Sequence, residues 1–107
     1  MATLKNVKLK VVGVTFVNED SGKSRQSIIS QLDENAAIFL QREPTNKYDK
    51  NAIRVMTLYG QVGYIGRDYA SILSEMMDAG RTFSAKVAEV DKYKDTYYLH
   101  IIIDEVE

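Results

Sequence analysis

The segment of the chain best suited to chemistry is residues 42–55, which read REPTNKYDKNAIRV. It places basic side chains around one tyrosine, Tyr48, and one carboxylate, Asp49, and it ends in the strand-like run AIRV. Cations, an aromatic ring and a single carboxylate in one loop are suited to holding a charged ligand. They do not form a pair of acids or a nucleophile with its base, as an enzyme would require.

The charge of the chain is distributed unevenly. The net charge is −1, which by itself does not predict a nucleic-acid partner. Residues 42–67, however, carry a local charge of +3, from two acidic side chains (Glu43 and Asp49) and five basic ones: Arg42, Lys47, Lys50, Arg54 and Arg67. Because salt screens distant charges, the local field decides whether an anion binds, and this segment predicts an anion site.

Other segments that resemble reactive motifs do not support an enzyme. The run SGKS at 21–24 ends like a phosphate-binding P-loop, but the glycine required five residues before Gly22 is replaced by Val17. His100 is the single histidine; without cysteine or a carboxylate at helical ligand spacing, it predicts neither a zinc site nor a catalytic triad. We therefore expect no catalytic residue, no metal and no cofactor.

Length and composition describe an ordinary globular domain. The 107 residues are enough for one domain, 1–107, and 45% of them are hydrophobic. The absence of cysteine excludes disulfides and thiol chemistry. No apolar run reaches the length of a membrane span and no signal peptide is recognisable, so we expect a cytoplasmic protein without a membrane partner.

Hydrophobic periodicity predicts six strands and two helices. Their order is β-α-β-β-β-α-β-β, with strands near 7–16, 36–42, 52–58, 59–65, 83–87 and 97–103 and helices near 24–32 and 67–79. Gly13 suggests a bend in the first strand, and residues 91–95 are expected to form a hairpin loop. The pair Asp104–Glu105 looks solvated. Short connections favour antiparallel pairing, so the predicted fold is mainly β with two helices (α+β), a small six-stranded barrel.

The second helix has the clearest pattern. Its apolar positions recur every three or four residues, which predicts one buried stripe: Tyr69, Ile72, Leu73, Met76 and Met77.

The motif REPTNKYDKNAIRV, followed by GQVGYIGRDYASIL, resembles the HIRAN domain family, and VVGVTF at 11–16 is similar to that family's first strand. The matching positions are Arg42, Glu43, Pro44, Asn46, Tyr48, Asp49, Asn51, Ala52, Ile53, Val55, Val62 and Gly63. The resemblance covers almost the whole chain. It implies a barrel related to the OB-fold and a stand-alone bacterial or phage-type member. In some relatives the domain lies at the front of a helicase that acts at stalled replication forks. This implies a link to DNA repair and a helicase or nuclease partner.

The resemblance also implies a set of binding residues for single-stranded DNA or a 3′-hydroxyl DNA end. Carried over by position, they are Thr15, Phe16, Tyr48, Asp49, Lys50, Tyr64, Arg67 and Tyr97. Thr15 stands where a eukaryotic relative has arginine, which predicts a modest affinity. Aromatic rings would stack on bases, cations would meet phosphates, and Asp49 would accept a hydrogen bond from a terminal hydroxyl.

Alternatives remain at this point. Asp49 could simply bond its own turn backbone, and Tyr48 could lie on the barrel as a loop aromatic. Gly63 is more readily explained by close packing than by ligand contact. The same aromatic surface could instead receive a peptide, making the chain a protein-interaction or adaptor domain. A nuclease is the least supported interpretation, because the basic segment has no cluster of acids that could hold a metal.

Overall fold

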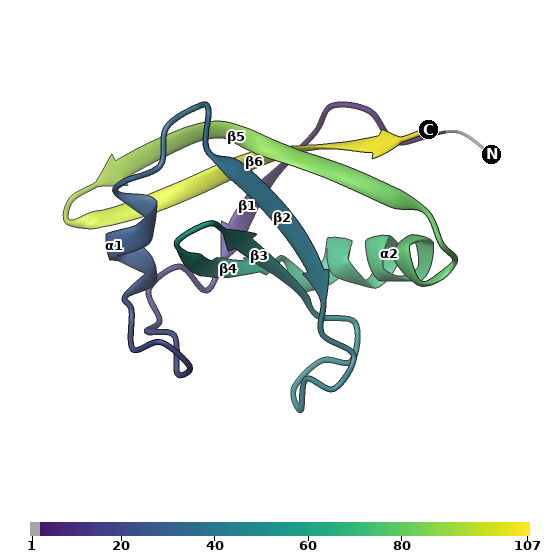
Figure 1. Ribbon diagram of the computed structural model, residues 1–107, viewed down its shortest axis with the longest axis horizontal. Coiled ribbons are helices and arrows are strands. Elements are labelled where there is room, and N and C mark those ends of the chain that lie inside the picture. Colours follow the sequence, from purple (N-terminus) through teal and green to yellow (C-terminus); the bar gives the residue numbers. More distant parts are fainter. Residues whose placement is uncertain (1–2) are drawn as a thin grey trace.

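The computed structural model describes residues 3–107 as a closed six-stranded antiparallel barrel with two helices (Figure 1). The elements are β1 (Val7–Val12), α1 (Arg25–Ile29), β2 (Ala37–Arg42), β3 (Ile53–Thr57), β4 (Gly60–Ile65), α2 (Arg67–Asp78), β5 (Thr82–Tyr93) and β6 (Thr96–Val106). Around the barrel the strands follow the order β1-β4-β3-β2-β5-β6, and β6 pairs with β1 to close it. The predicted element order and fold class are confirmed.

The core consists of the inward-facing side chains of the strands. Strand alternation places Ile53 and Val55 of β3 and Leu99, Ile101 and Ile103 of β6 in the interior, all of them fully buried. The two helices add Ile29 and Leu73 to the same cluster. The buried members of this core are aliphatic, and four partly buried aromatic residues pack against it: Tyr69, Phe83, Tyr97 and Tyr98.

A close approach of backbones explains Gly63 in β4. A Cβ atom at this position would lie 2.3 Å from the carbonyl oxygen of Val12 and 2.6 Å from a side-chain carbon of Val11. Only glycine fits where β4 passes β1, so the packing explanation for Gly63 is confirmed.

The chain leaves β1 earlier than predicted. Gly13 adopts φ +70°, a left-handed conformation that ends the strand at Val12, so Thr15 and Phe16 lie in the loop that follows. The bend predicted at Gly13 is correct. The first helix is also shorter than predicted, although Ser24 caps it by accepting a hydrogen bond from the Ser27 backbone N–H, as expected.

The last hairpin is longer than the periodicity suggested. Strands β5 and β6 pair as far as Tyr93 and Thr96, so the connecting loop is Lys94–Asp95 and the predicted loop 91–95 is wrong. Lys94 adopts φ +56°, which allows the tight turn. In Figure 1 this hairpin extends beyond the barrel on the side of α1.

Two burial predictions fail. Ile72 is 56% exposed, because α2 turns Ala70, Leu73 and Ser74 toward the barrel instead. Glu105 is buried, not solvated, because Arg81 donates hydrogen bonds of 2.7 and 2.6 Å to its two carboxylate oxygens. The Arg81 guanidinium holds the pKa of Glu105 below its usual range.

Within residues 3–107, neither helix has the length and apolar character needed to cross a membrane.

Candidate functional site

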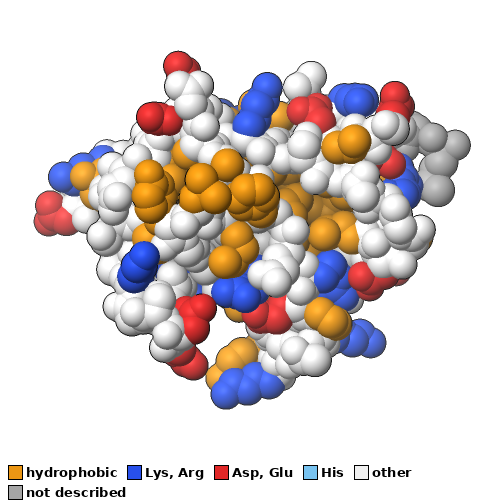
Figure 2. All heavy atoms as spheres, viewed as in Figure 1, with side chains coloured by type: hydrophobic (Ala, Val, Ile, Leu, Met, Phe, Trp, Pro, Cys, Tyr) orange, Lys and Arg blue, Asp and Glu red, His pale blue; other side chains and the backbone are white. Residues whose placement is uncertain are grey.

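One open pocket of about 800 Å³ lies between two loops at the edge of the barrel. The loop after β1 forms one wall, the loop after β2 forms the other, and β3 and β4 provide the floor. Figure 2 shows the hollow at the bottom of the view, between two lobes of the surface. Its volume is in the range that holds a small molecule or a nucleotide.

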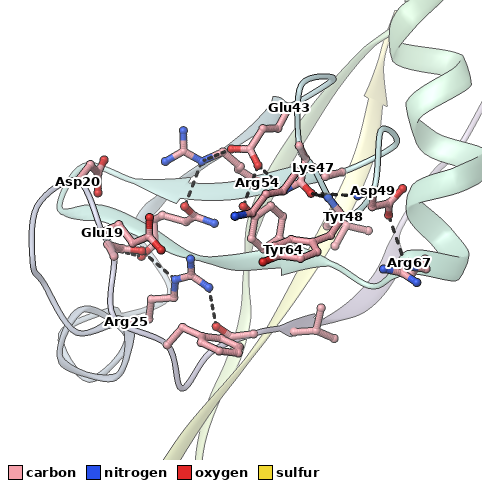
Figure 3. A pocket seen from close by; sticks show the side chains of 18 of the residues that line it. Glu19, Asp20, Arg25, Glu43, Lys47, Tyr48, Asp49, Arg54, Tyr64 and Arg67 are labelled. Carbon is pink, nitrogen blue, oxygen red and sulfur yellow. Dashed lines mark hydrogen bonds and ion pairs between the residues drawn. The ribbon is translucent and has the colours of Figure 1, made fainter.

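The pocket brings together five of the eight residues carried over from the family resemblance. Phe16, Tyr48, Asp49, Tyr64 and Arg67 all line it, although they come from two loops, from β4 and from the start of α2 (Figure 3). Phe16 and Tyr48 are 64% and 77% exposed. Such exposure of large rings beside a cavity leaves their faces free to stack on a ligand.

The other three residues lie outside the pocket lining. Thr15 is exposed in the loop after β1. Lys50 contributes its carbonyl oxygen to a hydrogen bond from Arg42. The backbone N–H of Tyr97 donates to Gln26 at 2.6 Å, and the ammonium of Lys92 lies 5.3 Å from its ring centroid. The binding roles assigned to these three stay predictions.

The loop that carries Tyr48 is organised by its own polar side chains. The Oδ1 atom of Asn46 accepts hydrogen bonds from the backbone N–H groups of Tyr48 and Asp49, at 2.8 and 3.0 Å. Asn46 also donates to Glu43 Oε1 at 2.6 Å. These local bonds fix the backbone and leave the Tyr48 ring projecting, with the Lys47 ammonium 5.1 Å from its centroid. The ring is therefore not packed onto the barrel.

The two carboxylate oxygens of Asp49 have different partners. Oδ1 accepts a 2.9 Å hydrogen bond from the Asn51 backbone N–H, which is the turn role that the sequence also allowed. Oδ2 lies 3.7 Å from Nε of Arg67, a long ion pair with an arginine side chain that is itself 75% exposed. One carboxylate oxygen thus stabilises the loop, while the other borders the pocket.

Arg25 is a pocket residue that the sequence reasoning missed. Its guanidinium donates to the Gly13 carbonyl oxygen and to Asn18 Oδ1, both at 2.8 Å, and lies 5.8 and 5.6 Å from the ring centroids of Phe16 and Tyr64. Burial lowers the pKa of this guanidinium, although arginine stays charged at neutral pH. A basic residue directly after a helix cap is electrostatically unfavourable, and this was the one feature of the sequence that set Arg25 apart.

The floor of the pocket is a buried polar network. Asn18 donates to the Gln61 carbonyl oxygen at 2.9 Å, and the Gln61 side chain donates to the Gly63 carbonyl oxygen at 3.0 Å. Arg54 donates to Gln61 Oε1 at 3.1 Å and lies 3.5 Å from Glu43 Oε2. Since these groups satisfy each other, the floor is rigid before any ligand arrives.

The local charge of +3 in residues 42–67 does not appear in the pocket. Arg42 is held by Asp78 of α2 at 2.9 Å, and this bond raises the pKa of Arg42. The pocket lining contains four basic and four acidic residues: Arg25, Lys47, Arg54, Arg67, Glu19, Asp20, Glu43 and Asp49. The opposite loop contributes Glu19 and Asp20, so the formal charge of the lining is zero.

The acidic residues of the loop after β1 nonetheless stand apart from the basic residues of the lining. Figure 3 shows Glu19 and Asp20 on one side and Glu43, Lys47, Asp49 and Arg67 on the other, with Arg25 and Arg54 between them. A ligand with an anionic end and a neutral ring would therefore be oriented by this field.

A closed OB-like barrel with a pocket of aromatic and charged side chains at its edge defines a small binding domain. Residues 4–103 match the HIRAN domain family, and the chain belongs to it. It is 48% identical over 48 residues to the helicase-like transcription factor of Oryctolagus cuniculus; the match covers 44% of this chain and 5% of that protein.

Two solved structures have the same fold. A protein from Lactobacillus plantarum has a TM-score of 0.70 and 28% identity, covering 96% of this chain and 95% of that one. The HIRAN domain of human HLTF has a TM-score of 0.68 and 26% identity, covering 98% of this chain and 79% of that one.

Proposed function

We propose that the chain is a non-catalytic nucleic-acid-binding module that holds the 3′-hydroxyl end of single-stranded DNA in the pocket. The observation that carries the proposal is the convergence of two exposed rings, Phe16 and Tyr48, with Asp49 and Arg67 around one cavity. Family membership supports it, since the relative it matches is a helicase-like transcription factor. We extend the proposal to DNA repair or fork processing, with a helicase or nuclease as partner.

The rings would supply sequence-independent affinity. Every base has an apolar face, and stacking on an aromatic side chain contributes roughly 1–3 kcal/mol per base. Phe16 and Tyr48 come from the two opposite walls, so a terminal base could enter between the loops and contact either ring. A base paired within a duplex cannot offer its face in this way, which favours single strands.

The sugar–phosphate backbone of the DNA strand would follow the side of the pocket that carries Lys47 and Arg67. Lys47 and Arg67 are exposed at the rim, whereas Arg54 is engaged by Glu43 and Gln61. Two cations neutralising two phosphates of a single strand predict a slope of about −1.4 in log affinity against log salt. That is shallow for a DNA-binding protein, and it agrees with the zero formal charge of the lining.

Asp49 would distinguish the chemistry of the end. Its Oδ2 can accept a hydrogen bond from a hydroxyl group, and Arg67 is near enough to orient the adjacent phosphate. A 3′-phosphate offers no such donor at neutral pH and brings a second anion to the carboxylate.

The direct test is a fluorescence-anisotropy titration with oligonucleotides labelled at the 5′ end. A single strand with a 3′-hydroxyl should bind more tightly than the same strand with a 3′-phosphate, and more tightly than a blunt duplex. Equal affinity for the three would contradict the proposal. A peptide-binding domain would instead bind peptides with an affinity that barely changes with salt, and it would show no binding to the labelled DNA strands.

A further inference from the structure

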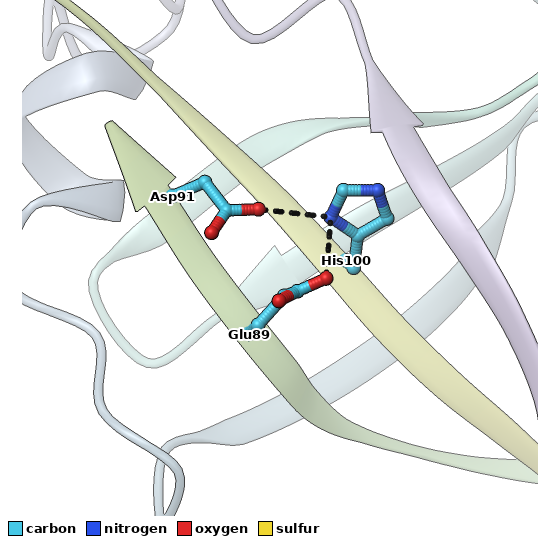
Figure 4. Close-up of side chains that lie close together, drawn as sticks. All are labelled: Glu89, Asp91 and His100. Atoms are coloured by element: carbon cyan, nitrogen blue, oxygen red, sulfur yellow. Dashed lines mark ion pairs between the residues drawn. The ribbon is translucent and has the colours of Figure 1, made fainter. Parts of the chain in front are cut away.

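A second cluster of chemically competent side chains lies on the outer face of β5 and β6, and it shares no residue with the pocket (Figure 4). Glu89 and Asp91 come from β5 and His100 from β6, with Glu89 directly opposite His100 in the strand register. Their nearest donor atoms all lie within 4.8 Å of one another. Periodicity did not reveal this group, because the three residues meet only through strand pairing.

A β-bulge creates the cluster. The register shifts between Val87 and Glu89, so that one extra residue, Ala88, stands in β5. Before the bulge, Val87 faces the core opposite Ile101; after it, Val90 is the residue opposite the buried Leu99. Without the extra residue, strand alternation would point Glu89 and Asp91 inward. The bulge therefore turns both carboxylates to the face that carries His100.

The Nδ1 atom of His100 is aimed between the two carboxylates. It is buried and makes no hydrogen bond within the described residues, because Glu89 Oε1 at 3.6 Å and Asp91 Oδ2 at 3.7 Å are beyond hydrogen-bonding distance. Donors bound to one tetrahedral zinc ion at about 2.0–2.1 Å are separated by about 3.4 Å. The spacing from His100 to each carboxylate is thus close to that of a coordination shell.

We propose that Glu89, Asp91 and His100 form a binding site for a divalent transition-metal ion of the zinc class. One imidazole nitrogen and two carboxylate oxygens are donors that such ions accept, and solvent would complete the coordination. The carboxylate side chains are 44% and 53% exposed, which gives an ion access from water. The ion would join β5 to β6 in the hairpin, so binding should also stabilise the folded chain.

The ammonium group of Lys8 would compete with a metal ion for the carboxylate of Glu89. Its ammonium donates a 2.9 Å hydrogen bond to the same Oε1 of Glu89 that lies nearest to His100, and this bond lowers the pKa of Glu89. A metal ion at Oε1 would have to displace that ammonium or draw on the second oxygen. Removing the lysine charge should therefore tighten metal binding.

The test is a titration of the tag-free, metal-stripped chain with Zn²⁺ against a chromophoric chelator, with NMR of the imidazole as a second readout. His100 is the only histidine, so any imidazole shift is assigned without ambiguity. We expect saturable binding of one ion, a shift of the His100 signals and a rise in melting temperature. His100→Gln and Asp91→Asn should each weaken binding by at least the roughly tenfold typical of a perturbed metal shell.

Two further variants separate coordination from general charge. Lys8→Gln should tighten Zn²⁺ binding several-fold, while Asp95→Asn, an acid in the hairpin turn outside the cluster, should leave the affinity unchanged. Both ligand variants must retain the wild-type circular dichroism spectrum; if one unfolds, the other carries the test. The site is ruled out if wild-type protein leaves the His100 signals unmoved by Zn²⁺, or if His100→Gln and Asp91→Asn bind as tightly as wild type.

Discussion

The hydroxyl group of Tyr64 donates a 2.9 Å hydrogen bond to Oε1 of Glu43, joining β4 to the loop that follows β2 across the floor of the pocket. Glu43 also accepts from Asn46 at 2.6 Å and lies 3.5 Å from Arg54. Its carboxylate, although part of the pocket lining, is therefore engaged by groups of the protein. The same carboxylate holds the loop that presents Tyr48.

Tyr64→Phe tests this relationship. The substitution removes one hydrogen bond but keeps the ring against which Arg25 lies, so the free energy of unfolding should fall by about 1 kcal/mol in a urea titration. DNA affinity should fall only a few-fold, because the loop loses one of its anchors. Tyr59→Phe, at an exposed tyrosine outside the pocket lining, is the matched control and should change neither quantity. A loss of all binding in Tyr64→Phe would assign the hydroxyl to ligand contact instead.

Much of the fold was predictable because its signals are local. Alternation in β6 and the three-to-four-residue repeat in α2 each reflect one face packed on the core, so the element order followed directly. The exposure of Ile72 was not predictable from the repeat, since the direction from which the barrel covers α2 is a tertiary property. The bulge at Ala88 was equally hidden, because it exists only relative to the opposite strand.

The pocket was predictable where a motif marked it and nowhere else. The family motifs pointed to Phe16, Tyr48, Asp49, Tyr64 and Arg67, which do line the cavity. Arg25, Glu19 and Asp20 come from the loop after β1 and the start of α1, and apart from the unfavourable place of Arg25 after the helix cap, nothing in their own neighbourhood indicates that they face the loop after β2. The charge of the site therefore could not be obtained by summing one segment.

Tyr48→Ala should weaken binding of single-stranded DNA without unfolding the domain. Loss of one stacking platform corresponds to roughly 1–3 kcal/mol, or about five- to a hundredfold in affinity. Tyr48 is 77% exposed, so the free energy of unfolding should change by less than about 0.5 kcal/mol. Tyr93→Ala, at a comparably exposed tyrosine in β5, should bind normally. A large drop in melting temperature for Tyr48→Ala would instead show a structural role.

Gly63→Ala should destabilise the barrel strongly. The added methyl carbon would be placed 2.3 Å from the Val12 carbonyl oxygen, so β1 and β4 must separate, at a cost of about 3 kcal/mol or more. Gly66→Ala is the matched control, because its nearest neighbour would be 3.9 Å away, and it should cost less than about 1 kcal/mol. Thermal and urea unfolding measure both. Equal stability of the two variants would refute the close-approach explanation.

Neutralising Glu19 and Asp20, the two acids in the loop after β1, should strengthen DNA binding. The double variant Glu19→Gln, Asp20→Asn changes the formal charge of the pocket lining from zero to +2, and the affinity for single strands should rise about threefold or more at low salt. Asp20→Asn keeps an oxygen for the Ser21 backbone N–H, so the loop should stay intact. The control Asp33→Asn, Glu34→Gln makes the same change in net charge outside the pocket. If both double variants bind single strands equally well, the gain in affinity comes from the total charge and not from the position of Glu19 and Asp20 in the pocket.

Asp49→Asn tests the selection of a hydroxyl end. The amide oxygen can replace Oδ1 in the 2.9 Å bond from the Asn51 N–H, so the loop should keep its shape. At the other position the carboxylate oxygen near Arg67 becomes a group that no longer repels a phosphate. A hydrogen bond to a charged acceptor contributes roughly 1.5–3 kcal/mol, so wild type should prefer a 3′-hydroxyl over a 3′-phosphate by about tenfold or more.

In Asp49→Asn that preference should shrink to less than about threefold, while stacking on Tyr48 retains part of the affinity for either strand. Parallel anisotropy titrations of the two labelled strands give the ratio directly, with Asp95→Asn as the control for loss of one acidic charge. Urea unfolding confirms that the variant remains folded. The assignment of Asp49 fails if wild type binds both ends equally, or if Asp49→Asn keeps the full preference, because the discriminating group would then lie elsewhere in the pocket.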